Sequence, residues 1–317
     1  MTSNTSAAGP HGRLAGEDPK EQFTAALLDG LWYRYRDEVE YVQVYEQVVA
    51  DKGAVFENDH IAFRTLAVQE PCVGRVSLSR LFEALGFRAA GNYYFEDKWL
   101  AATHFQHPNP GFPKLFISEL QVWRLPEEVR RRIQRVVAGH RPPLPLELLA
   151  RLEVLDDAGG SAAQEALDIL LNFFSSLPWE APPKEDVLKV NEVSQYGAWV
   201  LVHGYKVNHF TASINSHRTP DLDDIDKTVA ALRAAGVPMK DEVEGAPGSK
   251  LRQTATAAVV KEVTVREGDR LVTMPWTYAY FELAERGEVA DPETGRRVRF
   301  EGFLGPQAAQ LFEMTRR

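Results

Sequence analysis

Apolar side chains recur at helical spacing in two parts of the chain. In residues 20–53, large apolar residues such as Leu28 and Trp32 lie three or four positions apart, which predicts N-terminal helices. In residues 124–198, stripes of Val, Ile, Leu and Phe recur with the same period. Prolines clustered at 142–145 interrupt this second part. The pattern therefore predicts a broken helical segment in the middle of the chain.

The other residues show short apolar runs that are typical of strands. The order in residues 54–123 is strand, helix and then three strands, and residues 199–290 repeat it. The first set has strands at 60–66, 87–95, 99–105 and 115–122, with a helix over 77–85 that Ser77 would cap. The second set has strands at 205–215, 251–259, 261–265 and 277–283, with a helix over 221–235 that Thr219 would cap.

The two sets share landmarks that indicate a diverged internal repeat. His60 and His209 each precede the glycine that ends the following helix, by 26 and 27 residues. The late strands align as FISELQV with YFELAER, which matches Glu119 with Glu282. Landmarks in one order at similar offsets predict an α+β fold of two βαβββ modules. The alternative is a mixed protein with two unrelated α/β stretches.

Composition and charge narrow the possible functions. The 317 residues are 44% hydrophobic, enough for a large core, and the formal charge of −9 with no basic stripe argues against a nucleic-acid partner. We find no apolar run near the roughly 18 residues of a membrane helix, and no secretory signal. The single cysteine, Cys72, excludes an internal disulfide and a cysteine-rich zinc site. We expect a cytoplasmic protein without a membrane partner, in which residues 1–19 form a disordered tail and residues 20–317 a single catalytic domain.

Two histidines and one glutamate are the candidate metal ligands. His60 and His209 occupy equivalent early-strand positions in the two modules, and Glu282 lies in an otherwise apolar strand. A carboxylate that faces a core is costly unless it is paired or binds a metal. Two imidazoles and one carboxylate form the facial set of non-haem Fe(II) oxygenases, which leaves coordination positions open for substrate and dioxygen. Each residue alone could instead be an ordinary hydrogen-bonded or ion-paired side chain.

Strand alternation places Arg64 beside these candidate ligands. Residues two apart on a strand share a face, so Arg64 points to the same side as His60 and Ala62. A guanidinium there is suited to the carboxylate of an anionic substrate, although a surface arginine paired with a nearby acid is the alternative. Gln253 and Thr256 lie on opposite faces of a later strand, and both are candidate substrate contacts.

Five segments carry a resemblance to a known family. They are HIAFRTL (60–66), FPKLFISELQV (112–122), GYKVNHFTASIN (204–215), YFELAERG (280–287) and EGFLGPQAAQLFE (301–313). In this order they resemble the 2-oxoadipate dioxygenase/decarboxylase family over about residues 27–313. The resemblance implies a vicinal-oxygen-chelate fold, in which two strand–helix–three-strand modules cup a metal between curled sheets. The helical segment 124–198 would then be an insertion between the modules.

The resemblance also implies an activity and the residues that carry it. It implies Fe(II) bound by His60, His209 and Glu282, with Arg64 holding a substrate carboxylate. The implied reaction converts 2-oxoadipate and O2 into 2-hydroxyglutarate and CO2, in lysine breakdown.

The chain departs from the longer bacterial members of this family in two respects. It is shorter, and its KLRQTATAA segment (250–258) has Thr and Ala where a serine-rich version is expected. A second substrate arginine is also expected in the C-terminal segment, residues 291–317, where Arg299 is the candidate, beside Arg296 and Arg297. These differences affect the expected substrate more than the expected metal.

Other interpretations stay open from the sequence. His104 with His107, or His203 near His209, could replace a ligand. Zinc, nickel or manganese in the same fold would suit a glyoxalase-like isomerase or a hydrolase. A non-catalytic module that binds a small ligand is a further possibility. The pattern makes no prediction of oligomeric state.

Overall fold

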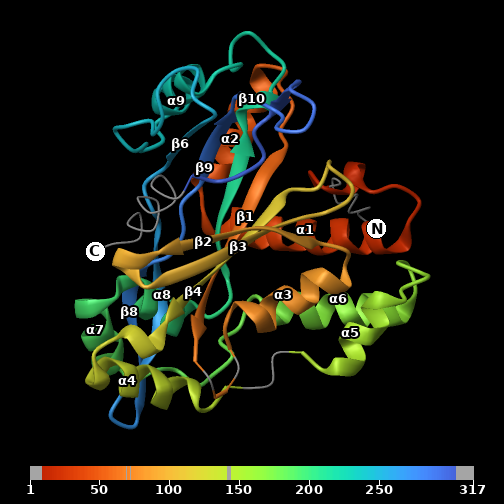
Figure 1. Ribbon diagram of the computed structural model, residues 1–317. Coiled ribbons are helices and arrows are strands. Elements are labelled where there is room, and N and C mark those ends of the chain that lie inside the picture. The colour runs from red at the N-terminus through yellow and green to blue at the C-terminus, as the bar shows by residue number, and fades with distance from the viewer. Residues whose placement is uncertain (1–8, 69, 72, 141–143, 305–317) are drawn as a thin grey trace, which may run out of the picture.

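The computed structural model describes residues 9–68, 70, 71, 73–140 and 144–304. A seven-stranded mixed sheet runs through the centre of the molecule, in the order β2-β3-β4-β1-β5-β9-β6 (Figure 1). Its strands are β1 (Asn58–Ala67), β2 (Arg88–Phe95), β3 (Leu100–Gln106), β4 (Lys114–Gln121), β5 (Val207–Ser213), β6 (Leu251–Ala255) and β9 (Glu282–Arg286). The first module supplies four neighbouring strands and the second supplies three, and the modules join where β1 pairs antiparallel with β5.

The pairing of β1 with β5 confirms that His60 and His209 occupy equivalent positions in the two modules. His60 pairs with Thr211, two residues after His209. In the same way, His209 pairs with Ala62, two residues after His60, so exchanging the two histidines gives the same set of pairs. The same exchange maps the pairing of Ala62 with Phe116 in β4 onto the pairing of Thr211 with Glu282 in β9. The counterpart of Glu282 in the first module is therefore Phe116.

The alignment of Glu119 with Glu282 is accordingly wrong. Glu119 pairs in register with Thr65, and its Oε2 accepts a hydrogen bond of 2.9 Å from the backbone N–H of Arg75, at the start of α3 (Arg75–Ala84). A carboxylate at a helix N-terminus is stabilised by the exposed amides and the helix dipole. Glu119 thus has a structural role away from the metal ligands.

The second module also lacks the third strand that the sequence predicts for the main sheet. β7 (Val260–Glu267) and β8 (Arg270–Thr277) form a separate two-stranded sheet, and β9 begins only at Glu282. Alternate residues of β7 such as Val263 and Val265 are buried while their neighbours are exposed, and β7 contacts α7 (Lys184–Val193) and α8 (Gln195–His203). The hairpin packs on helices of the insertion, so β6 pairs directly with β9.

Helices cover the sheet in groups that follow the sequence. The N-terminal helices are α1 (Pro19–Glu38) and α2 (Tyr41–Asp51); α1 contacts β5 and α2 contacts α9 (Ile225–Ala234). The insertion forms α4 (Glu127–Val137), α5 (Leu146–Glu153), α6 (Ser161–Phe173), α7 and α8, all in the lower half of Figure 1. It ends at His203, later than the predicted boundary at 198, because α8 runs directly into the turn before β5.

Two predicted helix caps are wrong. The helix of the second module begins at Ile225, and Asp224 caps it by accepting a hydrogen bond of 2.8 Å from the backbone N–H of Lys227, in place of Thr219. The helix of the first module begins after Gly74, and the Ser77 hydroxyl donates to the Gly74 carbonyl at 2.8 Å. Each helix thus begins at a different residue from the one that its predicted cap implies.

The predicted disordered tail is wrong for residues 9–18, while residues 1–8 lie outside the described residues. His11 is fully buried, and its backbone N–H and Nδ1 lie 2.9 Å and 2.8 Å from Oδ1 of Asp29 on α1. A single-turn helix, Gly12–Leu14, follows it. A composition rich in small polar residues does not reveal one anchoring histidine.

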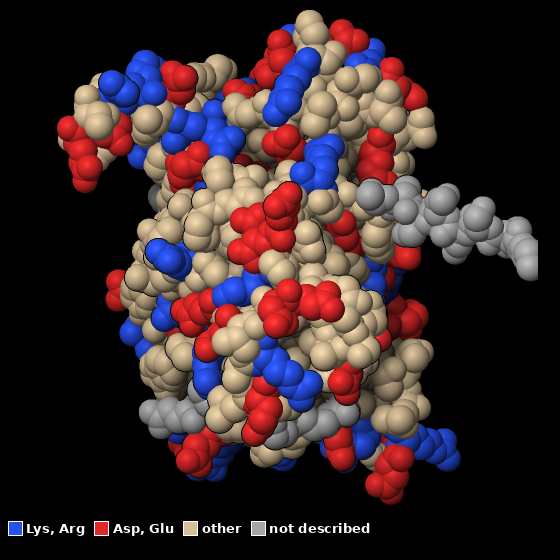
Figure 2. Space-filling view, turned by 90° about the vertical axis from the view of Figure 1, so that its right-hand side faces the viewer, with Lys and Arg blue, Asp and Glu red and all other residues tan. Residues whose placement is uncertain are grey.

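The surface carries both signs of charge. Figure 2 shows one face on which acidic and basic side chains are interspersed among other residues. Among the described residues, none of the helices combines the length and apolar character that crossing a membrane requires. The C-terminal part forms a small hairpin, β10 (Glu288–Ala290) with β11 (Arg297–Arg299), and residues 300–304 then return to the main sheet. Residues 305–317 of the C-terminal segment, and Cys72, lie outside the described residues.

Candidate metal centre

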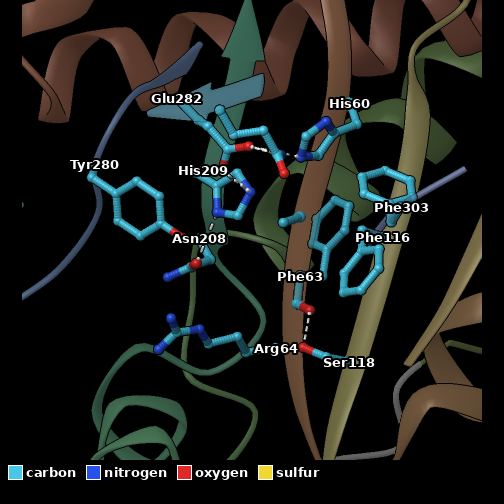
Figure 3. A pocket seen from close by; sticks show the side chains of 12 residues that line it. His60, Phe63, Arg64, Phe116, Ser118, Asn208, His209, Tyr280, Glu282 and Phe303 are labelled. Atoms are coloured by element: carbon cyan, nitrogen blue, oxygen red, sulfur yellow. Dashed lines mark hydrogen bonds and ion pairs between the residues drawn. The ribbon is translucent and has the colours of Figure 1, made fainter. Parts of the chain in front are cut away.

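Three side chains from neighbouring strands converge at the middle of the sheet. His60 lies on β1, His209 on β5 and Glu282 at the start of β9 (Figure 3). The His60 Nε2 atom is 3.6 Å from Glu282 Oε1, and His209 Nε2 is 3.2 Å from Glu282 Oε2. One ligand atom from each residue lies within 4.8 Å of the others, and all three residues are buried. The fold therefore brings together the three residues that the sequence suggests as ligands.

A β-bulge precedes each histidine. In the pairing of β1 with β5, Asp59 is an extra residue before His60, and Asn208 is an extra residue before His209. A bulge redirects side chains locally, so two consecutive residues can serve one site. Asp59 Oδ1 lies 2.8 Å from His60 Nδ1, and Asn208 Oδ1 lies 3.0 Å from His209 Nδ1. Each imidazole is thus held through Nδ1, which leaves Nε2 to face the carboxylate.

The Asp59 side chain is itself held by a buried arginine. Arg286 Nε and Nη2 donate to the two carboxylate oxygens of Asp59 at 2.5 Å and 2.7 Å. Arg286 Nη1 also donates to the carbonyls of Phe300 and Gly302 at 3.0 Å and 2.8 Å. Burial alone would raise the pKa of Asp59, but Arg286 and His60 hold it well below its usual range. Asp59 therefore stays ionised and keeps accepting from His60.

Burial favours the uncharged forms of the three metal-free side chains. It lowers the pKa of His60, although the hydrogen bond to Asp59 opposes this, and it lowers the pKa of His209 well below its usual value. Burial raises the pKa of Glu282 well above its ordinary range, and the hydrogen bond from Gln253 offsets this only in part. Neutral imidazoles are ready to bind a metal, and a bound cation would stabilise the ionised carboxylate.

The donor set fits a transition metal. Gln253 Nε2 donates to Glu282 Oε1 at 2.5 Å, whereas Glu282 Oε2 is buried and has no hydrogen-bond donor among the described residues. A buried carboxylate oxygen without a donor is costly, and a cation between it and the two imidazoles would remove this cost. Two imidazoles and a carboxylate with an open side suit a non-haem metal centre.

His60, His209 and Glu282 line one end of a cavity. Its lining comes from both modules and from the C-terminal segment, and consists of His60, Ala62, Phe63, Arg64, Phe116, Ser118, Asn208, His209, Gln253, Tyr280, Glu282 and Phe303. In Figure 3 Arg64 is drawn at the end away from Glu282 and His60. The cavity thus has the candidate metal ligands at one end and a cationic side chain at the other.

Arg64 is almost fully buried, with 1% of its surface exposed. Its guanidinium carbon lies 5.1 Å from the ring centre of Tyr196 and 5.2 Å from that of Trp199, and it hydrogen-bonds to the Tyr280 side chain. Aromatic faces stabilise a cation without neutralising its charge. Arg64 is therefore a buried positive charge at the cavity wall, as strand alternation from His60 predicts.

An aromatic wall covers the metal-binding end. Phe303, from the C-terminal segment, lies 4.8 Å from the His60 ring centre and 4.9 Å from that of Phe116, and its backbone N–H donates to the Tyr93 hydroxyl at 3.2 Å. Arg286 lies 5.2 Å from the Phe303 ring centre. The segment that closes the cavity is therefore tied to the arginine that holds Asp59.

Comparisons with known proteins bear on this site. The family model described as 2-oxoadipate dioxygenase/decarboxylase matches residues 29–298. The chain belongs to this family. The rice protein named 2-oxoadipate dioxygenase/decarboxylase, chloroplastic/amyloplastic (Oryza sativa subsp. japonica), is 28% identical over 277 residues, which are 81% of this chain and 68% of the relative. The location named for that plant protein differs from the cytoplasmic location expected here, which stays a prediction.

Two solved structures have the same fold. The hydroxyglutarate synthase from Oryza sativa, in complex with 2-oxoadipate, has a TM-score of 0.76 at 23% identity and covers 100% of this chain and 98% of its own. A glyoxalase-superfamily protein from Ralstonia eutropha has a TM-score of 0.76 at 23% identity and covers 90% and 86%. The curled sheet of vicinal-oxygen-chelate type that the sequence predicts is confirmed.

Two residues that the sequence suggests as substrate contacts, Thr256 and Arg299, do not line the cavity. The Thr256 hydroxyl accepts from the backbone N–H of Phe281 at 3.0 Å and donates to the carbonyl of Ala257 at 2.9 Å, so it joins two strands outside the cavity lining. Arg299 is exposed and pairs with Glu301 at 2.6 Å. Gln253 does line the cavity, where it donates to Glu282.

The other candidate arginines and the alternative histidine ligands also lie outside the cavity lining. Arg296 and Arg297 are exposed, and Arg297 pairs with Glu288 at 2.7 Å. His203 lies on α8, with Nε2 2.9 Å from the Thr277 carbonyl. His104 Nδ1 lies 2.9 Å from the Tyr93 hydroxyl, and His107 Nδ1 accepts from the backbone N–H of Asn109 at 3.0 Å. None of the three belongs to the ligand group formed by the described residues.

Proposed function

We propose that the protein is an Fe(II)-dependent 2-oxoadipate dioxygenase/decarboxylase. It would convert 2-oxoadipate and O2 into 2-hydroxyglutarate and CO2, as a step of lysine breakdown. The observation that carries the proposal is one cavity with His60, His209 and Glu282 at one end and Arg64 in the wall beyond them. The family match, and the relative solved with 2-oxoadipate bound, support it.

His60, His209 and Glu282 would hold the iron. Three protein ligands on one side leave up to three coordination positions that face the cavity. When bound, Fe(II) supplies a chelation site for the keto and carboxylate oxygens of a 2-oxo acid and the electrons that activate O2. Asp59 and Asn208 keep the two imidazoles in the tautomer that presents Nε2 to the metal.

Arg64 would bind the second carboxylate of the substrate. His60 and Arg64 are four residues apart on one strand face, which separates their Cα atoms by about 13 Å. Both side chains extend into the cavity between them, and the two carboxylates of 2-oxoadipate are separated by four carbon atoms. A guanidinium suits a carboxylate because it can donate two parallel hydrogen bonds. The arrangement would thus favour a dicarboxylic 2-oxo acid.

The aromatic wall would keep water away from the reaction. Phe116 and Phe303 line the cavity with their rings. Their apolar rings lower the local dielectric and strengthen the interactions of Arg64 with an anionic ligand. Exclusion of water would also protect reactive intermediates of the reaction from side reactions.

The test is turnover of 2-oxoadipate by protein loaded anaerobically with Fe(II). On addition of O2, the proposal expects equal amounts of O2 consumed, CO2 released and 2-hydroxyglutarate formed. The His60→Ala variant, checked for folding by circular dichroism, should lose iron and turnover together.

Oxygen dependence separates the proposal from other metal enzymes of this fold. An isomerase or a hydrolase would act on its substrate without O2. Iron-loaded protein that leaves 2-oxoadipate unchanged in air would contradict the proposal, and so would full activity of the His60→Ala variant.

A further inference from the structure

The two residues that orient the metal-binding imidazoles differ in charge. Asp59 and Asn208 occupy equivalent bulge positions in the two modules, and each accepts a hydrogen bond from Nδ1 of the next residue. Either a carboxylate or an amide oxygen can do this. Orientation of the imidazole alone therefore does not explain why one module has Asp and the other has Asn.

The chemistry of His209 fixes which way the Asn208 amide points. If His209 binds the metal through Nε2, its Nδ1 carries the proton and needs an acceptor. The amide oxygen, at 3.0 Å, is that acceptor, so the amide nitrogen Nδ2 is directed away from the imidazole. This nitrogen is buried and has no hydrogen-bond acceptor among the described residues, although Asn208 lines the cavity and is only 1% exposed.

A buried amide nitrogen without an acceptor is unfavourable in the ligand-free protein. In Figure 3 Asn208 is drawn between His209 and Arg64, and all three residues line the same cavity. A ligand that extends from the metal-binding end toward Arg64 would pass this nitrogen. A carboxylate oxygen of the ligand is then the natural acceptor for its N–H groups.

The contrast with Asp59 explains why the residue is not Asp. Asp59 is paired through both oxygens with Arg286, which neutralises its charge. A carboxylate at position 208 would stand in the cavity with Arg64, attract its guanidinium and repel an anionic ligand. Asparagine keeps the acceptor for His209, places no negative charge beside Arg64 and adds a donor.

We propose that Asn208 is a substrate-binding residue, whose Nδ2 donates to the ligand carboxylate that Arg64 binds. Together the two side chains form a subsite for the second carboxylate of a dicarboxylic 2-oxo acid. The inference rests on the proposed function for the class of ligand, and it concerns binding rather than turnover.

The test compares two ligands that differ only at this carboxylate, 2-oxoadipate and 2-oxohexanoate. Their dissociation constants are measured by anaerobic calorimetry on Fe(II)-loaded wild-type and Asn208→Asp protein. The Asp variant keeps an acceptor for His209, so iron content should stay near the wild-type value. Its affinity for 2-oxoadipate should fall about ten- to hundredfold, and its affinity for 2-oxohexanoate should change less than about threefold.

Two further variants keep the test decisive. Asn208→Leu has the same number and branching of side-chain heavy atoms and no charge, so it replaces the Asp variant if that protein does not fold, and it should lose the same preference for 2-oxoadipate. Asp59→Asn is the matched control, since it alters the other orienting residue outside the cavity lining and should leave the ratio of the two dissociation constants unchanged.

The possible failures are distinguishable. A preference for 2-oxoadipate in the wild-type protein that Asn208→Asp abolishes supports the inference, even if 2-oxoadipate is not turned over and the proposed reaction is wrong. Equal binding of both ligands by the wild-type protein overturns it. So does an equal loss for both ligands in Asn208→Asp, or the same change of ratio in Asp59→Asn.

Discussion

Replacing Arg286 by Met should strongly destabilise the protein, because it leaves the Asp59 carboxylate buried without its partner. The Arg286 side chain is fully buried, and Asp59 is 2% exposed. The substitution removes two charge-assisted hydrogen bonds to Asp59 and two to the carbonyls of Phe300 and Gly302. Breaking a buried ion pair on one side costs about 3–5 kcal/mol.

The assay is urea unfolding of metal-free protein in the presence of a chelator, so that metal binding does not contribute. At pH 7 the Arg286→Met variant should lose about 3–5 kcal/mol. The surface variant Arg131→Met is the control, because Arg131 and its partner Glu127 are largely exposed, and it should lose less than about 0.5 kcal/mol. Asp59→Asn combined with Arg286→Met should recover part of the loss, since no buried charge is then left alone.

The effect should also depend on pH. The folded-state pKa of Asp59 is depressed, so its contribution is fully present above the ordinary carboxyl pKa of about 4 and is lost as the pH falls through the folded-state value. The difference between wild type and Arg286→Met should therefore shrink below about pH 4. A loss below about 1 kcal/mol at pH 7, or a difference that grows in acid, would refute the reasoning.

Four further outcomes follow from the site. Metal uptake should release protons, because burial raises the pKa of Glu282 well above its ordinary range and a bound cation favours the ionised carboxylate; calorimetry in buffers of different ionisation enthalpy measures this, and no release would contradict the direction of the shift. The affinity of the protein for the metal should rise with pH as Glu282 ionises. Arg64→Met should weaken 2-oxoadipate binding about ten- to hundredfold with unchanged iron content, and wild-type affinity would exclude Arg64 from the subsite. Tyr196→Phe should cost about 1–3 kcal/mol in urea unfolding, because its hydroxyl accepts from Thr65 N–H at 3.1 Å and lies 2.8 Å from Ser118 Oγ; an unchanged midpoint would show that water replaces it.

The sequence carried enough information to predict the modules, the ligand group and the position of Arg64. Strand alternation is a strict geometric rule, so His60 and Arg64 necessarily share a face of β1. The repeat paired His60 with His209 correctly, and the register of β1 with β5 confirms it. Glu282 stands out because it lies in an apolar strand, where a buried carboxylate needs a partner or a metal.

The rest depends on tertiary structure that no local pattern encodes. The roles of Asp59 and Asn208 arise from bulges, each of which adds one residue to the pairing of β1 with β5. Arg286 could not be distinguished from the exposed arginines near it, because its partner lies 227 positions earlier in the chain. Composition cannot show that β7 and β8 pack on the insertion, and Thr256 and Arg299 were misplaced because their partners belong to neighbouring loops and strands.

The most direct test of the central claim is a crystal structure of the protein loaded anaerobically with Fe(II), with anomalous data at the iron absorption edge. We predict one strong peak between the Nε2 atoms of His60 and His209 and the carboxylate of Glu282. A peak at a different group of side chains, or an ion bound by only one of these three residues, would contradict the account.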